Sequence, residues 1–359
     1  MPEYIEYKDS IAFHPGYYVK ELIEESGMTQ EDYAKRLGTT PKNLSLLVRG
    51  EQSLSVEMAS KLAKMLGTSM SYWLNLQNAY DEMLATMASD KEMLEEKAIL
   101  KQLGYGYFRD HFGLPALPRK LEEQVVCVRG FLKIASLTVL RNRDLAISFR
   151  GALESGDEAN VVKANAMTQI AVNEALSVDA PKFNKGQFGD AVDYLLTQTC
   201  NHNGFYPLIK ERLLKAGVIF VVLPNLPGSM VNGATKKIGD NVLLMVNDRH
   251  RYADSFWFTL LHEVGHVMHG DYGISCHSDS GEREDAADEY ARDKLIDSAA
   301  YFEFTQEGDF SAHAVRAFAE RIGRDPGIVV GRLQKDGYVR YNDPSLNLLR
   351  CRYQVKVVG

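Results

Sequence analysis

The sequence has few cysteines, and none of them is placed for a structural role. Only Cys127, Cys200, Cys276 and Cys351 occur in 359 residues, and no two of them form a CxxC pair. Closely spaced cysteines are typical of the disulfide frameworks of small secreted proteins and of cysteine zinc sites. We therefore expect neither feature, and the scarcity favours a reducing compartment.

Long apolar runs and an excess of basic residues are also missing. The longest apolar run, Val218–Leu223, is far shorter than the ~20 residues of a membrane helix. Residues 1–10 are acidic and lack the apolar core of a secretory signal. The net charge of −7 excludes a protein that binds polyanions through bulk charge, although a local basic surface is compatible with it. We expect a soluble, cytoplasmic protein without a membrane segment.

Hydrophobic periodicity and turn residues divide the chain into three stretches. Residues 1–85 contain short helices closed by glycines, and residues 86–190 are predicted to be helical without a chemical motif. In residues 191–359, strands over Val218–Leu223 and Val242–Val246 precede helices over Phe256–His269 and Glu282–Leu295. This succession predicts a mainly α protein with a smaller α+β domain at its C-terminal end, not a doubly wound sheet.

Two of the N-terminal helices, over Thr29–Arg36 and Pro41–Arg49, form a helix-turn-helix candidate. Four basic residues and no acidic residue lie between Tyr33 and Gly50. A second helix in this motif presents its N-terminal side chains to base edges and phosphates. The DNA-contacting candidates are therefore Thr40, Lys42, Asn43, Ser45 and Arg49. The same pattern also fits an ordinary helical corner whose charges are solvated.

A second motif, HExxH, occupies residues 262–266. On a helix, His262 and His266 share one face and can hold one Zn²⁺ ion, while Glu263 can act as general base towards a metal-bound water. The many apolar residues around them predict that this helix is buried. Gly265 would allow another backbone to approach closely.

A catalytic zinc site needs a third protein ligand and an open position. Glu284 lies on the next predicted helix, and Asp288 follows one turn later on the same face. Glu284 is the expected third ligand, and Asp288 would accept a hydrogen bond from a ligand histidine. His269 shares the face of His262 and is the alternative third ligand. Cys276 and His277 are interpreted as loop residues.

Several N-terminal segments together resemble the XRE-type helix-turn-helix of HigA-like antitoxins. The resemblance covers about residues 13–80 and implies a DNA-binding module that works as a dimer on an inverted-repeat operator, with a cognate toxin as a further partner. The segments that carry it are His14-Pro-Gly16, Gly27-Met-Thr-Gln-Glu31, Ala34-Lys-Arg-Leu-Gly38, Arg49-Gly50, Met58-Ala59 and Tyr72-Trp-Leu-Asn-Leu-Gln77.

The C-terminal stretch resembles the ImmA/IrrE family of zinc metallopeptidases, including long members fused to a HigA-like module. The resemblance implies a gluzincin-like domain with His262, His266 and Glu284 on Zn²⁺ and Glu263 as catalytic base, acting on repressor-type proteins. Tyr290 stands where the family commonly has phenylalanine, and we expect it to be a packing position. The segments that carry the resemblance are Leu223-Pro-Asn-Leu-Pro-Gly228, Asn232-Gly-Ala-Thr235, Phe256-Trp-Phe-Thr259, His262–Gly270, Glu284–Ala291 and Gly327–Gln334.

The sequence thus predicts three domains: a DNA-binding domain (1–85), a helical middle region (86–190) and a zinc endopeptidase (191–359). One alternative is a repressor or antitoxin whose metal site is structural or sensory. The other is a metalloenzyme whose helix-turn-helix only docks a protein partner. An extended substrate would pair with a sheet edge, for which Val242–Val246 and Asn232–Thr235 are the candidates. The same two segments fit an ordinary internal hairpin equally well. Met83–Leu103 is a candidate dimer surface whose apolar residues fit a core equally well. The oxyanion donor is left open among His250, Tyr252, Tyr272 and His277.

Overall fold

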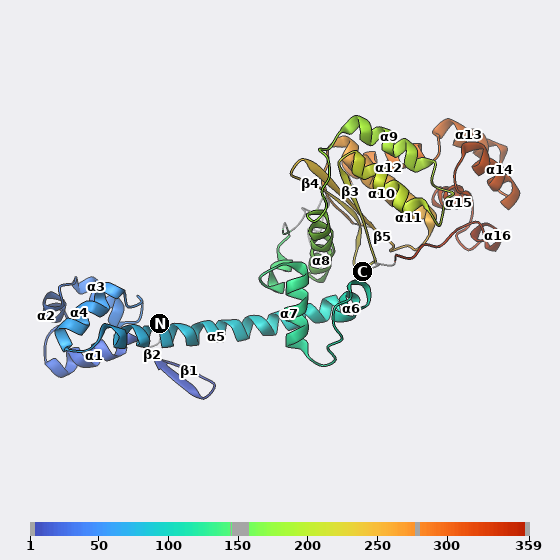
Figure 1. The fold of residues 1–359 in the computed structure, drawn as a ribbon. Coiled ribbons are helices and arrows are strands. Elements are labelled where there is room, and N and C mark those ends of the chain that lie inside the picture. Colours follow the sequence, from blue (N-terminus) through green and yellow to red (C-terminus); the bar gives the residue numbers. More distant parts are fainter. Residues whose placement is uncertain (1–3, 144, 146–157, 277–280, 356–359) are drawn as a thin grey trace. The chain divides into compact units, whose positions relative to one another are not determined.

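The computed structural model describes residues 4–143, 145, 158–276 and 281–355. The chain forms two compact units, residues 1–95 and 96–359. The boundary lies inside helix α5 (Met70–Leu103), which supplies Trp73 to the core of the first unit and Leu100 to that of the second. The domain boundaries predicted near residues 85 and 190 each fall within a continuous helix, α5 and α9 (Lys185–Leu196) (Figure 1).

The first unit is a hairpin followed by short helices that polar caps delimit. Thr29, Thr40 and Ser55 each accept a hydrogen bond from the backbone N–H three residues later, which satisfies a donor that the helix leaves free. These caps confirm the predicted helix starts, whereas the hairpin was not predicted. The elements are β1 (Tyr4–Tyr7), β2 (Ser10–Phe13), α1 (Pro15–Ser26), α2 (Gln30–Leu37), α3 (Pro41–Val48) and α4 (Val56–Leu66).

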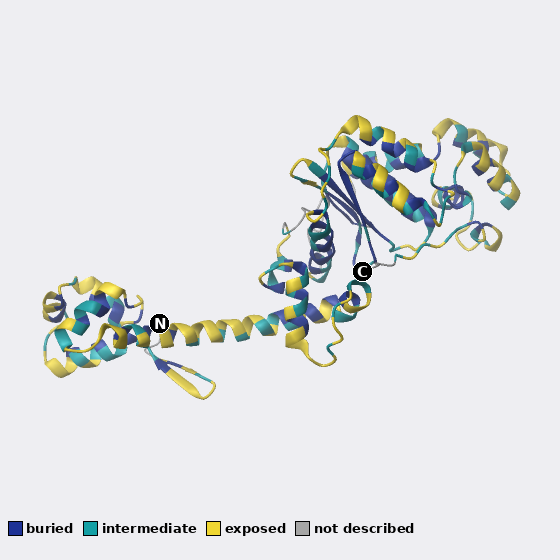
Figure 2. Ribbon diagram, viewed as in Figure 1, coloured by how far each residue is buried: buried dark blue, intermediate teal, exposed yellow. Residues whose placement is uncertain are grey.

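The hairpin packs on the first part of α5. Ile5 and Ala12 form a small core with Tyr80, and Met83 and Met87 pack against it. No residue of α5 between 81 and 95 is fully buried (Figure 2). Two methionines of the predicted dimer surface, Met83 and Met87, therefore already pack against this small core, and the last residues of that surface enter the core of the second unit.

The second unit places six helical elements before a sheet of four strands, among the residues described. Strand order is β3-β5-β4-β6, with β3 parallel to β5 and the other pairs antiparallel. None of the described helices is long and apolar enough to span a membrane. The elements are α6 (Tyr105–Phe112), α7 (Leu121–Leu132), η1 (Leu137–Arg141), α8 (Glu158–Ala175), α9, α10 (Phe205–Lys215), β3 (Val218–Leu223), β4 (Val231–Ile238), β5 (Asn241–Asn247), α11 (Ala253–His269), β6 (Gly273–Cys276), α12 (Glu282–Leu295), α13 (Ser298–Glu307), α14 (Ala312–Ile322), α15 (Pro326–Lys335) and α16 (Pro344–Asn347).

Helices cover both faces of the two strands β3 and β5. On one face Phe220 and Leu244 join the core formed with α9, α10 and α11. On the other face Val221 and Met245 are also buried, and α8 packs on both strands. Strands buried on both faces are apolar throughout, which explains their uninterrupted apolar runs. Helix α8, from the predicted middle region, is thus one layer of the second unit (Figures 1 and 2).

The prediction of a free sheet edge beside α11, the helix that carries the HExxH motif, is wrong for both candidate segments. Val242–Val246 belongs to β5, which lies between β3 and β4, and Asn232–Thr235 belongs to β4, which lies between β5 and β6. The edge strands of the described sheet are β3 and β6. Strand β6 has only four residues, and all of them are buried. Its sequence therefore lacks the alternation of polar and apolar residues that would predict a strand pairing with β4.

Where α5 enters the second unit, the buried Glu96 joins three elements. Its carboxylate accepts a hydrogen bond from the backbone N–H of Leu137 at 2.7 Å and lies 3.3 Å from the guanidinium of Arg129. A buried carboxylate that bonds a backbone N–H and a cation leaves both without a partner when it is removed.

We expect Glu96→Ala to lower the free energy of unfolding of the second unit by about 2–4 kcal/mol, because Leu137 N–H and Arg129 lose their acceptor. Glu92→Ala, an exposed position on the same helix, should stay within about 0.5 kcal/mol of the parent protein. Denaturant unfolding monitored by tryptophan fluorescence measures both. Equal effects of the two variants would show that Glu96 does not hold this junction.

Candidate metal centre and DNA-binding surface

Close packing of α11 on α12 brings the HExxH motif and Glu284 together. The apolar side of α11, including Trp257, Leu260 and Val264, is fully buried. A Cβ on Gly265 would lie 3.2 Å from Cα of Ala287 and 3.3 Å from the side chain of Tyr290. The glycine therefore permits the close approach that was predicted, with Tyr290 packed beside it.

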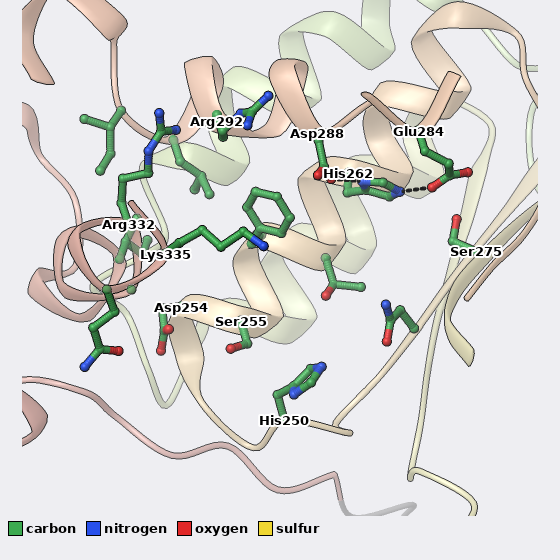
Figure 3. A pocket seen from close by; sticks show the side chains of 18 of the residues that line it. His250, Asp254, Ser255, His262, Ser275, Glu284, Asp288, Arg292, Arg332 and Lys335 are labelled. Carbon is green, nitrogen blue, oxygen red and sulfur yellow. Dashed lines mark hydrogen bonds and ion pairs between the residues drawn. The ribbon is translucent and has the colours of Figure 1, made fainter. Parts of the chain in front are cut away.

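His262, His266 and Glu284 form a cluster whose possible ligand atoms all lie within 4.8 Å of one another. The two Nε2 atoms are 3.0 Å apart, and the Glu284 carboxylate lies 3.0 Å from Nε2 of His262 and 3.3 Å from Nε2 of His266. Ligands of a tetrahedral Zn²⁺ ion, each about 2.0–2.1 Å from the metal, lie about 3.3 Å apart. These nitrogen and oxygen donors therefore fit zinc in both spacing and chemistry. Figure 3 shows two of the three residues, His262 and Glu284.

A carboxylate holds the other ring nitrogen of each histidine. Nδ1 of His262 lies 2.7 Å from Asp288, and Nδ1 of His266 lies 3.1 Å from Asp271. Such contacts fix the ring so that Nε2 points towards the metal. Asp288 occupies the place predicted for it, whereas Asp271 was not predicted. The sequence signal for Asp271 is its position directly after Gly270. At this glycine α11 ends in a left-handed turn, which folds the chain back onto the motif.

In the absence of a metal ion, a protonated His262 supplies the positive charge of the cluster. Burial lowers the pKa of His262, but hydrogen bonds with Asp288 and Glu284 outweigh it and raise this pKa to about 10. Burial likewise opposes ionisation of Glu284, but its contacts with His262 and His266 hold its pKa well below the usual range. A metal ion bound at Nε2 of His262 must therefore displace a proton.

Glu263 lies completely buried against β4. A Cβ on Gly233 would come within 2.6 Å of its carboxylate, so only glycine leaves room for this side chain at that point of the strand. The neighbouring Asn232 forms a bulge in the β4–β6 ladder and lines the pocket that contains His262. Glu263 itself is not among the residues that line this pocket.

The pocket has a volume of about 460 Å³ and reaches from the cluster along α11 to α15. His262 and Glu284 line it, and so does His250 among the four candidate oxyanion donors (Figure 3). Tyr252 instead contacts Arg352, Tyr272 packs against the core, and His277 lies outside the described residues.

The other histidine and cysteine near the motif lie apart from the cluster. His269, the alternative third ligand, is exposed and is not part of it. Cys276, interpreted as a loop residue, is instead buried in β6. Of the candidates weighed for the third position, the structure therefore brings Glu284 to the two histidines.

The predicted DNA-contacting residues follow the exposed side of α3 and its two ends. Lys42 and Asn43 are exposed, and Ser45 is half-buried. Thr40 is the N-cap of α3, and its hydroxyl oxygen accepts from the backbone N–H of Asn43 at 3.2 Å. Arg49 is exposed at the C-cap.

Ion pairs reduce the basic charge that the sequence suggests for this surface. Lys35 lies 2.9 Å from Glu31, and Arg49 lies 3.1 Å from Glu51. Arg36 and Lys42 make no ion pair within the described residues. Both acidic partners lie just outside the acid-free segment between Tyr33 and Gly50, so the charge count of that segment does not include them. Exposed pairs of this kind are weak, and phosphates can compete for the cations.

Comparisons with known proteins concern this N-terminal module. The helix-turn-helix family profile matches residues 19–73. The HTH-type transcriptional regulator YddM of Escherichia coli (strain K12) is 36% identical over 66 residues, which are 18% of this chain and 70% of that protein. Virulence-associated protein I of Dichelobacter nodosus is 31% identical over 75 residues, 21% of this chain and 69% of that protein. An addiction module antidote protein of the HigA family from Coxiella burnetii has 33% identity, covers 23% of this chain and 91% of that one, and has a TM-score of 0.22.

We expect Asp271→Ala to lower Zn²⁺ affinity by about 10–100-fold, as Asp288→Ala should, because each variant frees one histidine ring to rotate. Asp285→Ala is the matched control, since it removes the same charge from the pocket wall without contacting either histidine. Competition with a chromogenic chelator measures the three affinities. A loss in Asp288→Ala alone would remove Asp271 from the site.

Proposed function

This chain belongs to the XRE-type helix-turn-helix family of transcriptional regulators, and we propose that it binds an inverted-repeat operator as a homodimer and also carries a zinc-dependent endopeptidase. The helix-turn-helix assignment rests on the family match and on α2 and α3. Two modules related by a twofold axis are what operator half-sites one helical turn apart require.

One observation carries the endopeptidase proposal: a three-residue cluster with zinc-like spacing opens onto a pocket. Structural zinc sites are closed by four protein ligands, whereas catalytic sites have three and an open position. Within the described residues only His262, His266 and Glu284 converge, and two of them line the pocket. This arrangement favours catalysis over the alternative of a structural or sensory site.

Each residue around the cluster has a separate role in the proposed reaction. When bound, Zn²⁺ supplies Lewis acidity and lowers the pKa of water. His262, His266 and Glu284 would hold the ion, while Asp288 and Asp271 keep the two rings oriented. Glu263 would take the proton from water and pass it to the leaving amine, a role that requires its carboxylate to turn from Gly233 towards the pocket that His262 lines. Of the three candidates that the structure describes, His250 lines the pocket, and we assign it the hydrogen bond to the oxyanion.

The proposed substrate is a repressor-type protein cut in an extended segment, because a backbone carbonyl is open to attack only where the chain is drawn out. This follows the resemblance of the C-terminal stretch to metallopeptidases that act on repressors. A cognate toxin is a second proposed partner, through the HigA-like module.

Glu263→Gln should abolish cleavage and retain about one Zn²⁺ per chain, because the amide keeps the shape of the side chain but cannot accept a proton. The parent protein and the variant are incubated with candidate repressors, with and without chelator, and zinc is measured by elemental analysis. Cleavage by the variant at the parent rate would exclude Glu263 as the base. Full zinc occupancy without cleavage by either protein would favour the sensory alternative.

Lys42→Ala should weaken binding to all DNA sequences and reduce the salt dependence by about one counterion, since lysine contacts a phosphate. Asn43→Ala should instead relax base preference, because its amide can read a base edge. The probe is a duplex selected by the full chain from a random-sequence pool, titrated at several salt concentrations. Lys64→Ala, an exposed lysine on α4, is the control and should leave both properties unchanged. No selection of any duplex would contradict the DNA-binding proposal.

A further inference from the structure

The pocket beside the metal cluster has a basic end. Arg292 on α12 and Arg332 and Lys335 on α15 line it, together with apolar side chains. Figure 3 shows Arg332 and Lys335 on the α15 side and His262 with Glu284 towards the other end. The apolar lining residues are Phe258, Leu295, Ile296 and Ile328.

Two of these cations have no counterion among the residues that the structure describes. Arg332 lies 2.6 Å from Asp336 and stacks over the ring of Tyr301, so it is held in place. Arg292 and Lys335, in contrast, make no ion pair with any described residue. A charged group that lines a cavity without a counterion is available to an ionic ligand.

The acidic residues of the same pocket are engaged elsewhere. Asp254 accepts two hydrogen bonds from Arg350, at 3.1 and 2.7 Å. Glu284 and Asp288 contact His262, and in the zinc-bound form they would remain part of that centre. Among the described residues that line the pocket, Asp285 is the one remaining acid, and it is exposed. The α12–α15 end therefore carries an excess of available positive charge in a chain of net charge −7.

We propose that Arg292 and Lys335 form a specificity subsite that binds the carboxylate of an Asp or Glu side chain near the scissile bond of the substrate. This inference rests on the proposed endopeptidase function, because the other end of the same pocket is where the scissile peptide must lie. The apolar lining accommodates the methylene groups of the acidic side chain. Arg292 is half-buried and Lys335 is exposed, so the ion pair forms at the solvent-accessible mouth of the pocket and is screened by salt.

The test uses binding and not turnover, so that it does not depend on the natural substrate. The probes are fluorescein-labelled hexapeptide hydroxamates, in pairs that differ only by Glu or Gln at one position. One set carries the hydroxamate at the N-terminal end of the peptide and the other at the C-terminal end. The varied Glu or Gln therefore lies on one side of the metal in the first set and on the opposite side in the second. Fluorescence anisotropy with the zinc-loaded full chain gives each dissociation constant. We expect the Glu peptide of at least one pair to bind about tenfold more tightly, and less so at high salt.

Variants assign the preference to the two cations. Arg292→Gln with Lys335→Gln should remove the Glu preference and leave the affinity of the Gln peptide unchanged, which also shows that the variant is folded. Lys294→Gln is the matched control, because Lys294 lies on α12 but pairs with Asp193. Arg292→Glu with Lys335→Glu should reverse the preference in favour of a Lys peptide.

The outcomes separate this inference from the function on which it rests. Hydroxamates that bind without any Glu preference would overturn the subsite and leave the endopeptidase proposal standing. Zinc-loaded protein that binds no hydroxamate would overturn both. Competition by free succinate, with no difference between Glu and Gln peptides, would assign the basic end to a small anion and overturn the peptide subsite.

Discussion

The convergence of two Nε2 atoms and one carboxylate between α11 and α12 is the constraint on which the rest of the second unit depends. Three buried or half-buried polar groups at 3.0–3.3 Å from one another need a shared cation, either a proton or a metal ion. The helices must also approach closely enough to share it. The absence of a side chain at Gly265 and the small Ala287 opposite make that approach possible.

The surrounding acids are distributed so that each histidine has its own support. Asp288 comes from α12, while Asp271 comes from the turn after α11, so the two rings are oriented from different directions. Together with Glu284, these two aspartates place three carboxylates against the histidines, and one bound proton cannot balance their combined negative charge. A divalent cation satisfies this charge better than a proton does, which is why the pair of carboxylates behind the histidines argues for a metal centre.

The short helices of the first unit and the metal helix were predictable because their signals are local. Thr29, Thr40 and Ser55 cap the helices that follow them, and the four-residue spacing of His262 and His266 places both rings on one face of any α-helix. Glu284 and Asp288 were predictable for the same reason, since their spacing also marks one helical face. The β1–β2 hairpin escaped prediction because it packs on α5, some 70 residues away, and its strands have only four residues each.

What could not be predicted depends on contacts between distant segments. The pairing of β4 with β6 removes Asn232–Thr235 from the sheet edge, and nothing within β6 announces that pairing. Asp271 looks like an ordinary loop acid until the left-handed turn at Gly270 directs it back to His266. The basic end of the pocket is a stronger case, because Arg292 and Lys335 are 43 positions apart and each resembles a solvated helix charge. The two side chains line one pocket because α12 and α15 form different parts of its wall. Only this tertiary arrangement makes the two charges available to the same bound ligand.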